Sequence, residues 1–298
     1  MEWDLERIRA GAGGVRAVEK YPLARHTTIG IGGVADIAFF PKNAEELVRV
    51  LCAAEAEGAP CVVLGNGSNI LVADAGVRGV VVWTGGVCAV RRKEMALEAE
   101  CGVTVPALLR AALESGLGGL YFLAGIPASV GGAVYMNAGA QGRFIGGSVR
   151  RVTVLEDGRL RTWERADCRF SYKHTAFMER NCAIVSAELA VFPCDRQAER
   201  RRIAEVLSAR RRLPVGRSMG CVFQNPPGTT AGRLIEEAGL KGCRCGDAYV
   251  SGRHANFIIN GGRASADDVR CLIERIRQEV LRRTGIRLEE EIRYIGEF

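Results

Sequence analysis

The stretch Leu64-Gly-Asn-Gly-Ser-Asn-Ile-Leu71 places two glycines, two asparagines and a serine directly after a short apolar run. That run, 61–64, has β-branched residues and turn-forming neighbours, so it predicts a buried strand that leads into a tight loop. Glycine lets backbone N–H groups turn toward one point and lets a ligand approach the main chain closely. Such a loop suits a phosphate or pyrophosphate, although an ordinary tight turn has the same composition. The spacing is neither a Rossmann fingerprint nor a P-loop.

A second glycine-rich stretch, 125–133, reads Gly-Ile-Pro-Ala-Ser-Val-Gly-Gly-Ala and is also neutral. Two such loops with hydroxyl groups are typical of a large dinucleotide that is bound through backbone groups. The surrounding segment, 115–142, carries no charge and is long enough for a membrane span. Its glycines, with Pro127 and Asn137, instead indicate a buried glycine-rich segment, so we expect no membrane insertion.

Composition predicts a soluble globular protein, with 48% hydrophobic and 25% charged residues, and the length allows two domains. The net charge of +7 comes largely from arginines that crowd into 196–217. A solvated helix face is the first interpretation, and attraction of an anionic small substrate is the second. Aromatic residues are not interleaved with these arginines, so we expect no nucleic-acid partner.

The cysteines number eleven and show no disulfide framework. The close pair Cys243 and Cys245 lacks a second pair or histidines at zinc spacing, so no metal site is predicted. Reduced cytoplasmic thiols are the simplest interpretation. The chain is charged from Glu2 onward, which argues against a signal peptide and favours a cytoplasmic location.

Hydrophobic periodicity and capping residues predict an α+β fold with interspersed short elements. Asn43 with Glu46 resembles a capping box, and Glu156-Asp157-Gly158 predicts a hairpin. Helices are expected at 2–20 (frayed around 11–14), 43–58, 104–116, 195–213, 229–238 and 265–285. Strands are expected at 37–40, 61–64, 80–83, 89–92, 97–101, 149–155, 159–163, 183–192, 256–260 and 286–295.

The motifs also occur in a distinctive order along nearly the whole chain. They are His-Thr-Thr…Gly-Gly-Val-Ala-Asp at 26–36, the loop at 64–71, Gly-Ile-Pro…Asn-Ala-Gly-Ala at 125–140, Phe-Ser-Tyr-Lys-His-Thr-Ala-Phe at 170–177, Gly-Cys-Val-Phe-Gln-Asn-Pro at 220–226, Ala-Gly-Arg-Leu-Ile-Glu-Glu-Ala-Gly-Leu-Lys-Gly at 231–242, His-Ala-Asn-Phe-Ile-Ile-Asn at 254–260 and Leu-Glu-Glu-Glu-Ile-Arg-Tyr-Ile-Gly at 288–296. This series resembles the UDP-N-acetylenolpyruvoylglucosamine reductases, the MurB family of flavoenzymes, in its shorter form.

The resemblance implies an N-terminal helical segment (1–21), an FAD-binding domain of the p-cresol methylhydroxylase type (22–193) and an α+β substrate-binding domain (194–298). It implies an NADPH-dependent oxidoreductase that reduces the enolpyruvyl ether of UDP-N-acetylglucosamine to UDP-N-acetylmuramate for peptidoglycan. The cofactor would be non-covalent FAD, and the partners would be the UDP-sugar and NADPH.

Three residues carry the chemistry that the resemblance implies. Cys221 stands at the position of the family's serine proton donor, although a cysteine there also suits a small core position. Lys173 replaces an arginine and keeps the charge without the bidentate fork, but alone it reads as a loop lysine. Glu291 aligns with the catalytic glutamate, although by strand alternation it shares a solvated face with Arg287, Glu289 and Arg293.

The remaining candidates are binding residues carried over from the same motifs. For FAD they are Gly65, Asn66, Gly67, Ser68, Asn69, Ala128, Ser129, Gly132, Ala133, Asn137 and, on an apolar face, Ile184. Ala128 replaces a glycine, which the loop tolerates if its φ is negative. For substrate they are Asn225 and one of Arg211 or Arg212, whose guanidinium would meet the UDP phosphates.

Two other functions compete with this one. Another flavoenzyme on the same fold, such as an alcohol oxidase, needs no acid at Cys221 and no arginine-rich approach to a diphosphate. A flavin-binding protein that has lost catalysis is suggested by the departures at Lys173 and Cys221. Flavin colour and its bleaching by NADPH distinguish an active reductase from that second alternative.

Overall fold

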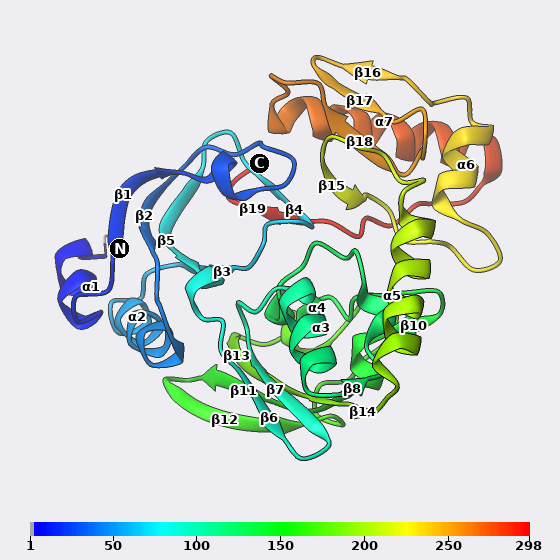
Figure 1. Cartoon of the computed structure of the whole chain (residues 1–298). Coiled ribbons are helices and arrows are strands. Elements are labelled where there is room, and N and C mark those ends of the chain that lie inside the picture. The colour runs from blue at the N-terminus through cyan, green and yellow to red at the C-terminus, as the bar shows by residue number, and fades with distance from the viewer. Residues whose placement is uncertain (1–2) are drawn as a thin grey trace. The chain divides into compact units, whose positions relative to one another are not determined.

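The computed structural model describes residues 3–298 and has the predicted α+β architecture (Figure 1). Contacts divide the chain into two compact units, each with its own hydrophobic core. Unit 1 contains the chain up to Glu19, Ile37–Asn66 and Gly79–Arg210, and unit 2 contains Lys20–Asp36, Gly67–Arg78 and Arg211–Phe298. The boundaries expected at 21/22 and 193/194 stay predictions, and residues 1 and 2 of the expected N-terminal segment lie outside the described residues.

The main sheet of unit 1 is antiparallel, with the strand order β12-β11-β13-β7-β6. Its strands are β6 (Val90–Lys93), β7 (Ala96–Glu100), β11 (Val149–Glu156), β12 (Arg159–Glu164) and β13 (Cys182–Ala190). The β11–β12 hairpin turns through Asp157 and Gly158, which both have positive φ (50° and 66°). The hairpin predicted at these residues is therefore confirmed, because a tight turn of this hand needs residues that tolerate positive φ.

The helices of unit 1 begin at residues whose side chains bond to their first turns. Thr104 Oγ1 accepts the Ala107 N–H at 3.3 Å, and Ser129 Oγ accepts the Gly132 N–H at 3.3 Å. Helix α4 packs on β13 and β7 (Figure 1). The helices are α1 (Leu5–Gly11), α2 (Ala44–Ala56), α3 (Val105–Glu114), α4 (Val130–Tyr135) and α5 (Arg196–Arg210).

A further sheet has the order β1-β2-β5-β3, and the chain passes between the units within β1 (Ala17–Pro22), β2 (Val34–Phe39) and β5 (Val77–Trp83). Strand β3 (Cys61–Leu64) is the strand predicted before the glycine loop, although only Leu64 of it is buried, and it pairs in parallel with β5 from Cys61↔Val80 onward. Short elements complete unit 1: β8 (Leu117–Gly118), β9 (Gly139–Ala140), β10 (Arg143–Phe144), β14 (Phe192–Pro193), η2 (Thr84–Gly86), η3 (Tyr121–Leu123), η4 (Ile145–Gly147) and η5 (Ala176–Met178).

Unit 2 is built on a sheet with the order β15-β18-β17-β16, against which helix α7 packs through β16 and β17 (Figure 1). Helix α7 begins with a capping box between Ser265 and Asp268 and ends at Gly285 with φ 70°, as predicted. Strands β4 and β19 pair in parallel, although they lie far apart in the sequence. The elements are η1 (Leu23–His26), β4 (Ile70–Val72), β15 (Arg217–Cys221), α6 (Ala231–Glu237), β16 (Arg244–Cys245), β17 (Ala248–Val250), β18 (Phe257–Asn260), α7 (Ala266–Thr284) and β19 (Arg293–Ile295).

Two predicted elements near the ends of the chain are partly wrong. The helix expected at 2–20 exists only as α1, and residues 17–22 form strand β1 instead. The strand expected at 286–295 exists only as β19, with an isolated bridge between Phe223 and Glu290 before it. Glu291 therefore lies outside a regular strand. Burial nevertheless alternates here as expected, because Leu288 and Ile292 are buried whereas Arg287, Glu289 and Arg293 are exposed and Glu291 is half-buried.

The start of α2 differs from the predicted capping box in one bond. Asn43 Oδ1 accepts the Glu46 N–H at 2.9 Å, as expected of the cap. Glu46 Oε2, however, accepts the N–H of Lys42 at 2.8 Å rather than that of Asn43. The box is thus shifted by one residue, because the chain before the cap turns its Lys42 amide toward the helix.

The cysteines are not all reduced, in contrast to the expectation from sequence. Cys245 on β16 and Cys271 on α7 form a disulfide in unit 2. Spacing along the chain draws attention to Cys243 and Cys245, but the fold brings Cys271, 26 residues away, to β16 instead. The other described cysteines are not disulfide-bonded, and burial raises the pKa of Cys101 to about 12.

Within residues 3–298, none of the helices has the length and apolar character that a bilayer crossing demands.

Candidate active site

In unit 1 the structure brings the two glycine-rich stretches together. A Cβ added at Gly65 would lie 2.2 Å from Ser129 Oγ, so this position has room only for glycine. The neighbouring Asn66 donates from Nδ2 to Pro127 O at 3.4 Å. The first part of the loop after β3 therefore lies directly against the stretch that begins α4, as two loops serving one dinucleotide require.

Residues 128–133 of the second stretch pack closely at the start of α4. Ala128 O accepts the Val105 N–H at 3.0 Å, and Ser129 is 1% exposed and caps α4. Among the described residues, the non-glycine residues with positive φ do not include Ala128, so alanine fits there without strain. Gly132 is exposed, whereas Ala133 is buried in the core.

The second part of the loop belongs to unit 2 and contacts the His-Thr-Thr motif. Gly67 has φ 60°, and a Cβ there would lie 2.0 Å from His26 O, so both the backbone conformation and the lack of space exclude a side chain. Thr28 donates its N–H to Gly67 O at 3.0 Å. Asn69 donates from Nδ2 to Glu291 O at 3.1 Å, and its carbonyl accepts the Arg293 N–H at 3.0 Å. Asn69, predicted to contact FAD, thus also anchors the segment that carries Glu291.

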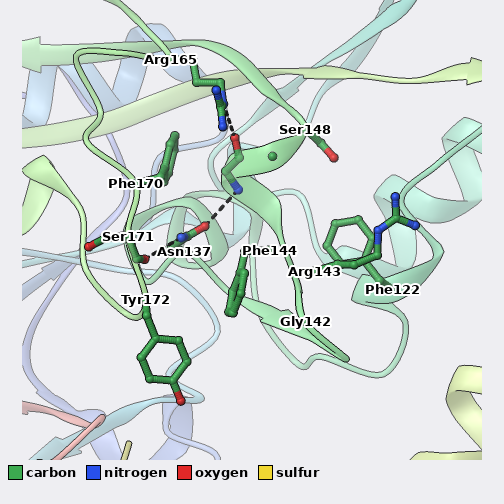
Figure 2. A pocket seen from close by; sticks show the side chains of 12 residues that line it. Phe122, Asn137, Gly142, Arg143, Phe144, Ser148, Arg165, Phe170, Ser171 and Tyr172 are labelled. Carbon is green, nitrogen blue, oxygen red and sulfur yellow. Dashed lines mark hydrogen bonds between the residues drawn. The ribbon is translucent and has the colours of Figure 1, made fainter. Parts of the chain in front are cut away.

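Asn137 holds three backbone segments of unit 1 around a cavity of about 450 Å³ (Figure 2). It is 4% exposed; its Nδ2 donates to Ser171 O at 2.7 Å, and its Oδ1 accepts the Gly146 N–H at 3.0 Å. A Cβ at Gly146 would lie 2.5 Å from Phe170 Cγ, so glycine permits this close packing. The role of Asn137 in shaping a wall was not evident from sequence.

The cavity walls combine aromatic rings with guanidinium groups (Figure 2). Phe144 and Tyr172 meet edge to face with their ring centroids 5.9 Å apart. Arg165 donates from Nε to Gly146 O at 2.8 Å, and Arg143 donates to Tyr121 Oη at 2.6 Å. Apolar walls with a few fixed polar groups are typical of a small-molecule site, and sequence reasoning identified only Asn137 in it.

Lys173 lies in a tight turn of unit 1, between Ser171 and His174, which pair as an isolated bridge. Its φ is 55°, an uncommon value for a lysine, and its side chain is half-buried. Ile184 lies on β13 opposite Val154 and is 8% exposed, so it belongs to the core of unit 1. Their roles toward substrate and flavin stay predictions.

In unit 2 the structure brings the segments of Cys221 and Glu291 together. Cys221 ends β15, opposite Phe257, and is half-buried. The next residue, Val222, accepts the Glu291 N–H on its carbonyl at 2.7 Å. The two residues predicted to carry the chemistry therefore belong to neighbouring backbone segments, although they lie far apart in sequence.

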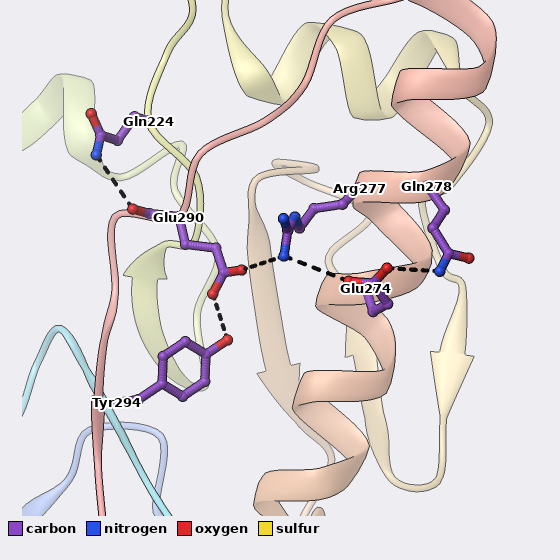
Figure 3. Close-up of polar contacts among 6 residues, drawn as sticks. All are labelled: Gln224, Glu274, Arg277, Gln278, Glu290 and Tyr294. Atoms are coloured by element: carbon purple, nitrogen blue, oxygen red, sulfur yellow. Dashed lines mark hydrogen bonds and ion pairs between the residues drawn. The ribbon is translucent and has the colours of Figure 1, made fainter. Parts of the chain in front are cut away.

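The Glu291 segment is also held through its neighbour Glu290 (Figure 3). Glu290 accepts from Tyr294 Oη at 2.5 Å and from Arg277 Nη1, on α7, at 3.2 Å. Burial, followed by this carboxylate, raises the pKa of Tyr294, so the phenol stays protonated. Gln224 Nε2 donates to Glu290 O at 3.3 Å. These contacts fix the backbone around Glu291, and no sequence signal singled them out.

The predicted substrate-binding residues of unit 2 are more exposed than Cys221 and Glu291. Asn225 Oδ1 accepts the Ala231 N–H at 3.0 Å, so part of its amide is occupied at the start of α6. Arg211 and Arg212 are exposed and follow directly after α5. Their contact with a UDP group stays a prediction. Among the described residues, no cluster of His, Cys, Asp or Glu has a metal-binding arrangement.

The comparisons with known proteins agree with this geometry. The model of an FAD-binding domain matches residues 35–162, and that of the C-terminal domain of UDP-N-acetylenolpyruvoylglucosamine reductase matches residues 212–295. The reductase of Moorella thermoacetica is 47% identical over 93% of this chain and 92% of its own length. That of Streptococcus pneumoniae is 40% identical over 93% of each chain.

Solved structures give the same result for the fold. The crystal structure of the reductase (MurB) from Thermus caldophilus matches with a TM-score of 0.80 and 37% identity, over 95% of this chain and 99% of that chain. A glucose dehydrogenase, Phl p 4.0202, shares the fold alone, with a TM-score of 0.50 and 12% identity over 63% of this chain and 44% of that chain.

The FAD-binding domain and the paired glycine loops define the class of the protein, an FAD-dependent oxidoreductase with a domain of the p-cresol methylhydroxylase type. Within that class the chain belongs to the family of UDP-N-acetylenolpyruvoylglucosamine reductases. The fold class and the FAD cofactor predicted from the sequence are therefore confirmed.

Proposed function

We propose that this protein reduces UDP-N-acetyl-3-O-(1-carboxyvinyl)-glucosamine to UDP-N-acetylmuramate with NADPH, in the cytoplasm, as a step of peptidoglycan precursor synthesis. The observation that carries the proposal is the match to reductases of that name at 47% identity over 93% of the chain. The pairing of the Cys221 and Glu291 segments supports it, because the reaction needs an acid and a second polar group near one carbon.

The residues of unit 1 fit an FAD pyrophosphate. Gly65 has no space for a side chain beside Ser129, so the backbone of the loop stays open to a ligand that approaches closely. Ser129, Gly132 and Asn66 lie at the same place, and together with Gly67, Ser68 and Asn69 they keep their proposed FAD role. FAD held by these residues would supply hydride-transfer chemistry between NADPH and the vinyl group of the substrate.

Cys221 then donates the proton that the neighbouring carbon requires. Addition of a hydride to the vinyl group leaves negative charge on that carbon and its carboxylate, and the Cys221 S–H neutralises it. A thiol is a stronger acid than the serine alcohol found at this position in the family. Glu291 orients the substrate or steadies the developing charge, and Lys173 places a cation on the carboxylate, without the two-pronged geometry of arginine. Asn225 and one of Arg211 or Arg212 hold the UDP portion.

Anaerobic stopped-flow absorbance tests the proposal. The NADPH-reduced protein is mixed with the enolpyruvyl substrate, and flavin reoxidation is followed for wild type, Cys221→Ala, Cys221→Ser and the exposed control Cys88→Ala. We expect reoxidation in wild type and Cys88→Ala, a large loss in Cys221→Ala and partial retention in Cys221→Ser.

Each other outcome removes a part of the proposal. Reduced wild type that ignores the substrate and reoxidises only with oxygen points to an oxidase on the same fold. Equal rates for wild type and Cys221→Ala keep the reaction but assign the proton to another donor.

A further inference from the structure

Asn256, just before β18, is almost fully buried, and it holds the backbone that follows Cys221 through three hydrogen bonds. Its side chain is 2% exposed; Oδ1 accepts the Phe223 N–H at 2.9 Å, and Nδ2 donates to Phe223 O at 2.8 Å. Its own carbonyl accepts the Val222 N–H at 2.9 Å. The primary amide thus pairs with Phe223 as a facing peptide group on a neighbouring strand would.

Ordinary strand pairing is interrupted before Cys221, which explains why a side chain is needed here. Strands β15 and β18 pair at Ser218↔Ile259 and again at Cys221↔Phe257, with an irregularity between these positions. Three residues of β15 thus advance against two of β18, and Gly220 lies within this bulge with φ 78°. The Asn256 amide restores regular hydrogen bonding immediately after the bulge and fixes the direction of the chain at Cys221.

The same stretch connects to Glu291. The N–H of Val222 is held by Asn256, and its carbonyl accepts the Glu291 N–H at 2.7 Å. Two residues after Val222, Gln224 donates its N–H to Glu289 O at 2.8 Å. A displacement of residues 222–223 would therefore change the position of Cys221 and of Glu291 together.

We propose that Asn256 is a positioning residue for the reduction, holding the Cys221 thiol and Glu291 in one arrangement. The inference rests on the proposed function of Cys221. Aspartate is nearly the same size as asparagine, but its carboxylate offers only acceptors and faces Phe223 O without a proton. The amide is therefore required for its donor, not only for its shape.

The test compares Asn256→Asp and Asn256→Ala with Asn260→Asp, a matched control at the other end of the same segment, where Asn260 is the last residue of β18. Asn260 is 6% exposed; its Nδ2 donates to Ile29 O at 2.9 Å, and its Oδ1 accepts the Gly262 N–H at 2.8 Å. The control therefore loses a buried amide of the same kind at a place without contact to Val222 or Phe223. Flavin reduction by NADPH and reoxidation by the enolpyruvyl substrate are measured separately, anaerobically, at saturating substrate, together with KM.

A misplaced acid affects only the second half-reaction. In both Asn256 variants we expect reoxidation to slow by roughly 10- to 100-fold, with flavin reduction and KM within about threefold of wild type. Asn260→Asp should change neither half-reaction, even where its thermal stability falls. Equal reoxidation rates for Asn256→Asp and Asn260→Asp overturn the inference.

A pH series on Asn256→Asp supplies the second readout. Below the pKa of the introduced carboxyl group, its O–H can donate to Phe223 O, so the reoxidation rate relative to wild type should rise as pH falls. The titratable neighbour on the same segment is His254, whose Nδ1 accepts the Asn256 N–H at 3.3 Å, and the same pH series on Asn260→Asp serves as the control for its titration. A flat ratio contradicts the proposal. If Asn256→Ala fails to retain FAD, the low-pH form of Asn256→Asp carries the test.

Should reduced wild type fail to reoxidise with the enolpyruvyl substrate, the proposed function itself falls and this inference with it. That result is distinct from wild-type turnover with unaffected Asn256 variants, which overturns the positioning role alone.

Discussion

Replacing Gly65 with alanine should disturb the glycine loop through one identifiable contact. The new Cβ would lie 2.2 Å from Ser129 Oγ and 3.2 Å from Ser129 Cβ, and Ser129 is 1% exposed. The serine hydroxyl must therefore rotate away, which removes its bond to the Gly132 N–H at 3.3 Å. Loss of such a helix cap costs about 1 kcal/mol, and a side chain forced off its rotamer adds roughly 0.5–1.5 kcal/mol.

The free energy of unfolding should thus fall by about 1.5–2.5 kcal/mol, or a few degrees in Tm. If the two loops serve FAD together, the same distortion should raise the Kd for FAD by about tenfold, which corresponds to ~1.4 kcal/mol. Thermal unfolding of the apoprotein and quenching of flavin fluorescence on binding measure the two quantities.

The double variant Gly65→Ala/Ser129→Gly provides the decisive comparison. Glycine at position 129 removes both clashing atoms, and glycine is a tolerated N-cap that costs only a few tenths of a kcal/mol relative to serine. We expect the double variant to be more stable than Gly65→Ala alone, although it carries two changes. If the free energy of unfolding lost in the double variant equals the sum of the losses in Gly65→Ala and Ser129→Gly, the contact with Ser129 is not the cause.

Three further predictions concern α7 and its surroundings. Asp74 accepts the Ala266 N–H at 2.8 Å, so Asp74→Asn should lower the free energy of unfolding in urea by about 1 kcal/mol. Cys271→Ser opens the loop to Cys245, 26 residues away, and should lower stability by about 3 kcal/mol; dithiothreitol should lower the Tm of wild type but not of this variant. Hydrogen bonds from two arginines of α7 lower the pKa of Glu279 to about 2, and the resulting stabilisation is complete above its ordinary pKa near 4.5. The stability difference between wild type and Glu279→Gln should therefore be constant above pH 5 and disappear between about pH 4.5 and 2.

Features that depend on neighbouring residues were predictable from the sequence. Strand β3 follows from its apolar run, and the starts of α3 and α7 follow from Thr104 and Ser265, because a cap bonds within its own first turn. The Asp157-Gly158 turn follows from the same local chemistry. Strong local preferences agreed with the final fold at these places.

Features that depend on distant partners were not predictable. The alternation at 286–295 predicts one long strand. Only residues 293–295 have a partner strand, β4, and the residues before them make a single bridge to Phe223, so they do not form a regular strand. Cys271 and Cys245 are joined only because α7 packs on β16. Asn256 belongs to a motif that the resemblance identified, but its bonds to Phe223 span 33 residues and become visible only in the structure. Family resemblance thus supplied candidate roles, and the fold supplied the contacts that support them.

The bond from Asn69 to the Glu291 carbonyl spans 222 residues of chain and lies beside the pairing of β4 with β19. A ribosome that adds about 5–20 residues per second needs roughly 10–40 s to travel that distance. During this interval Gly67–Arg78 has been made, but its partner strand does not yet exist. The second part of the glycine loop therefore acquires its final anchor only when residues 291–295 emerge. A message cut short before those codons would yield a loop without its anchor.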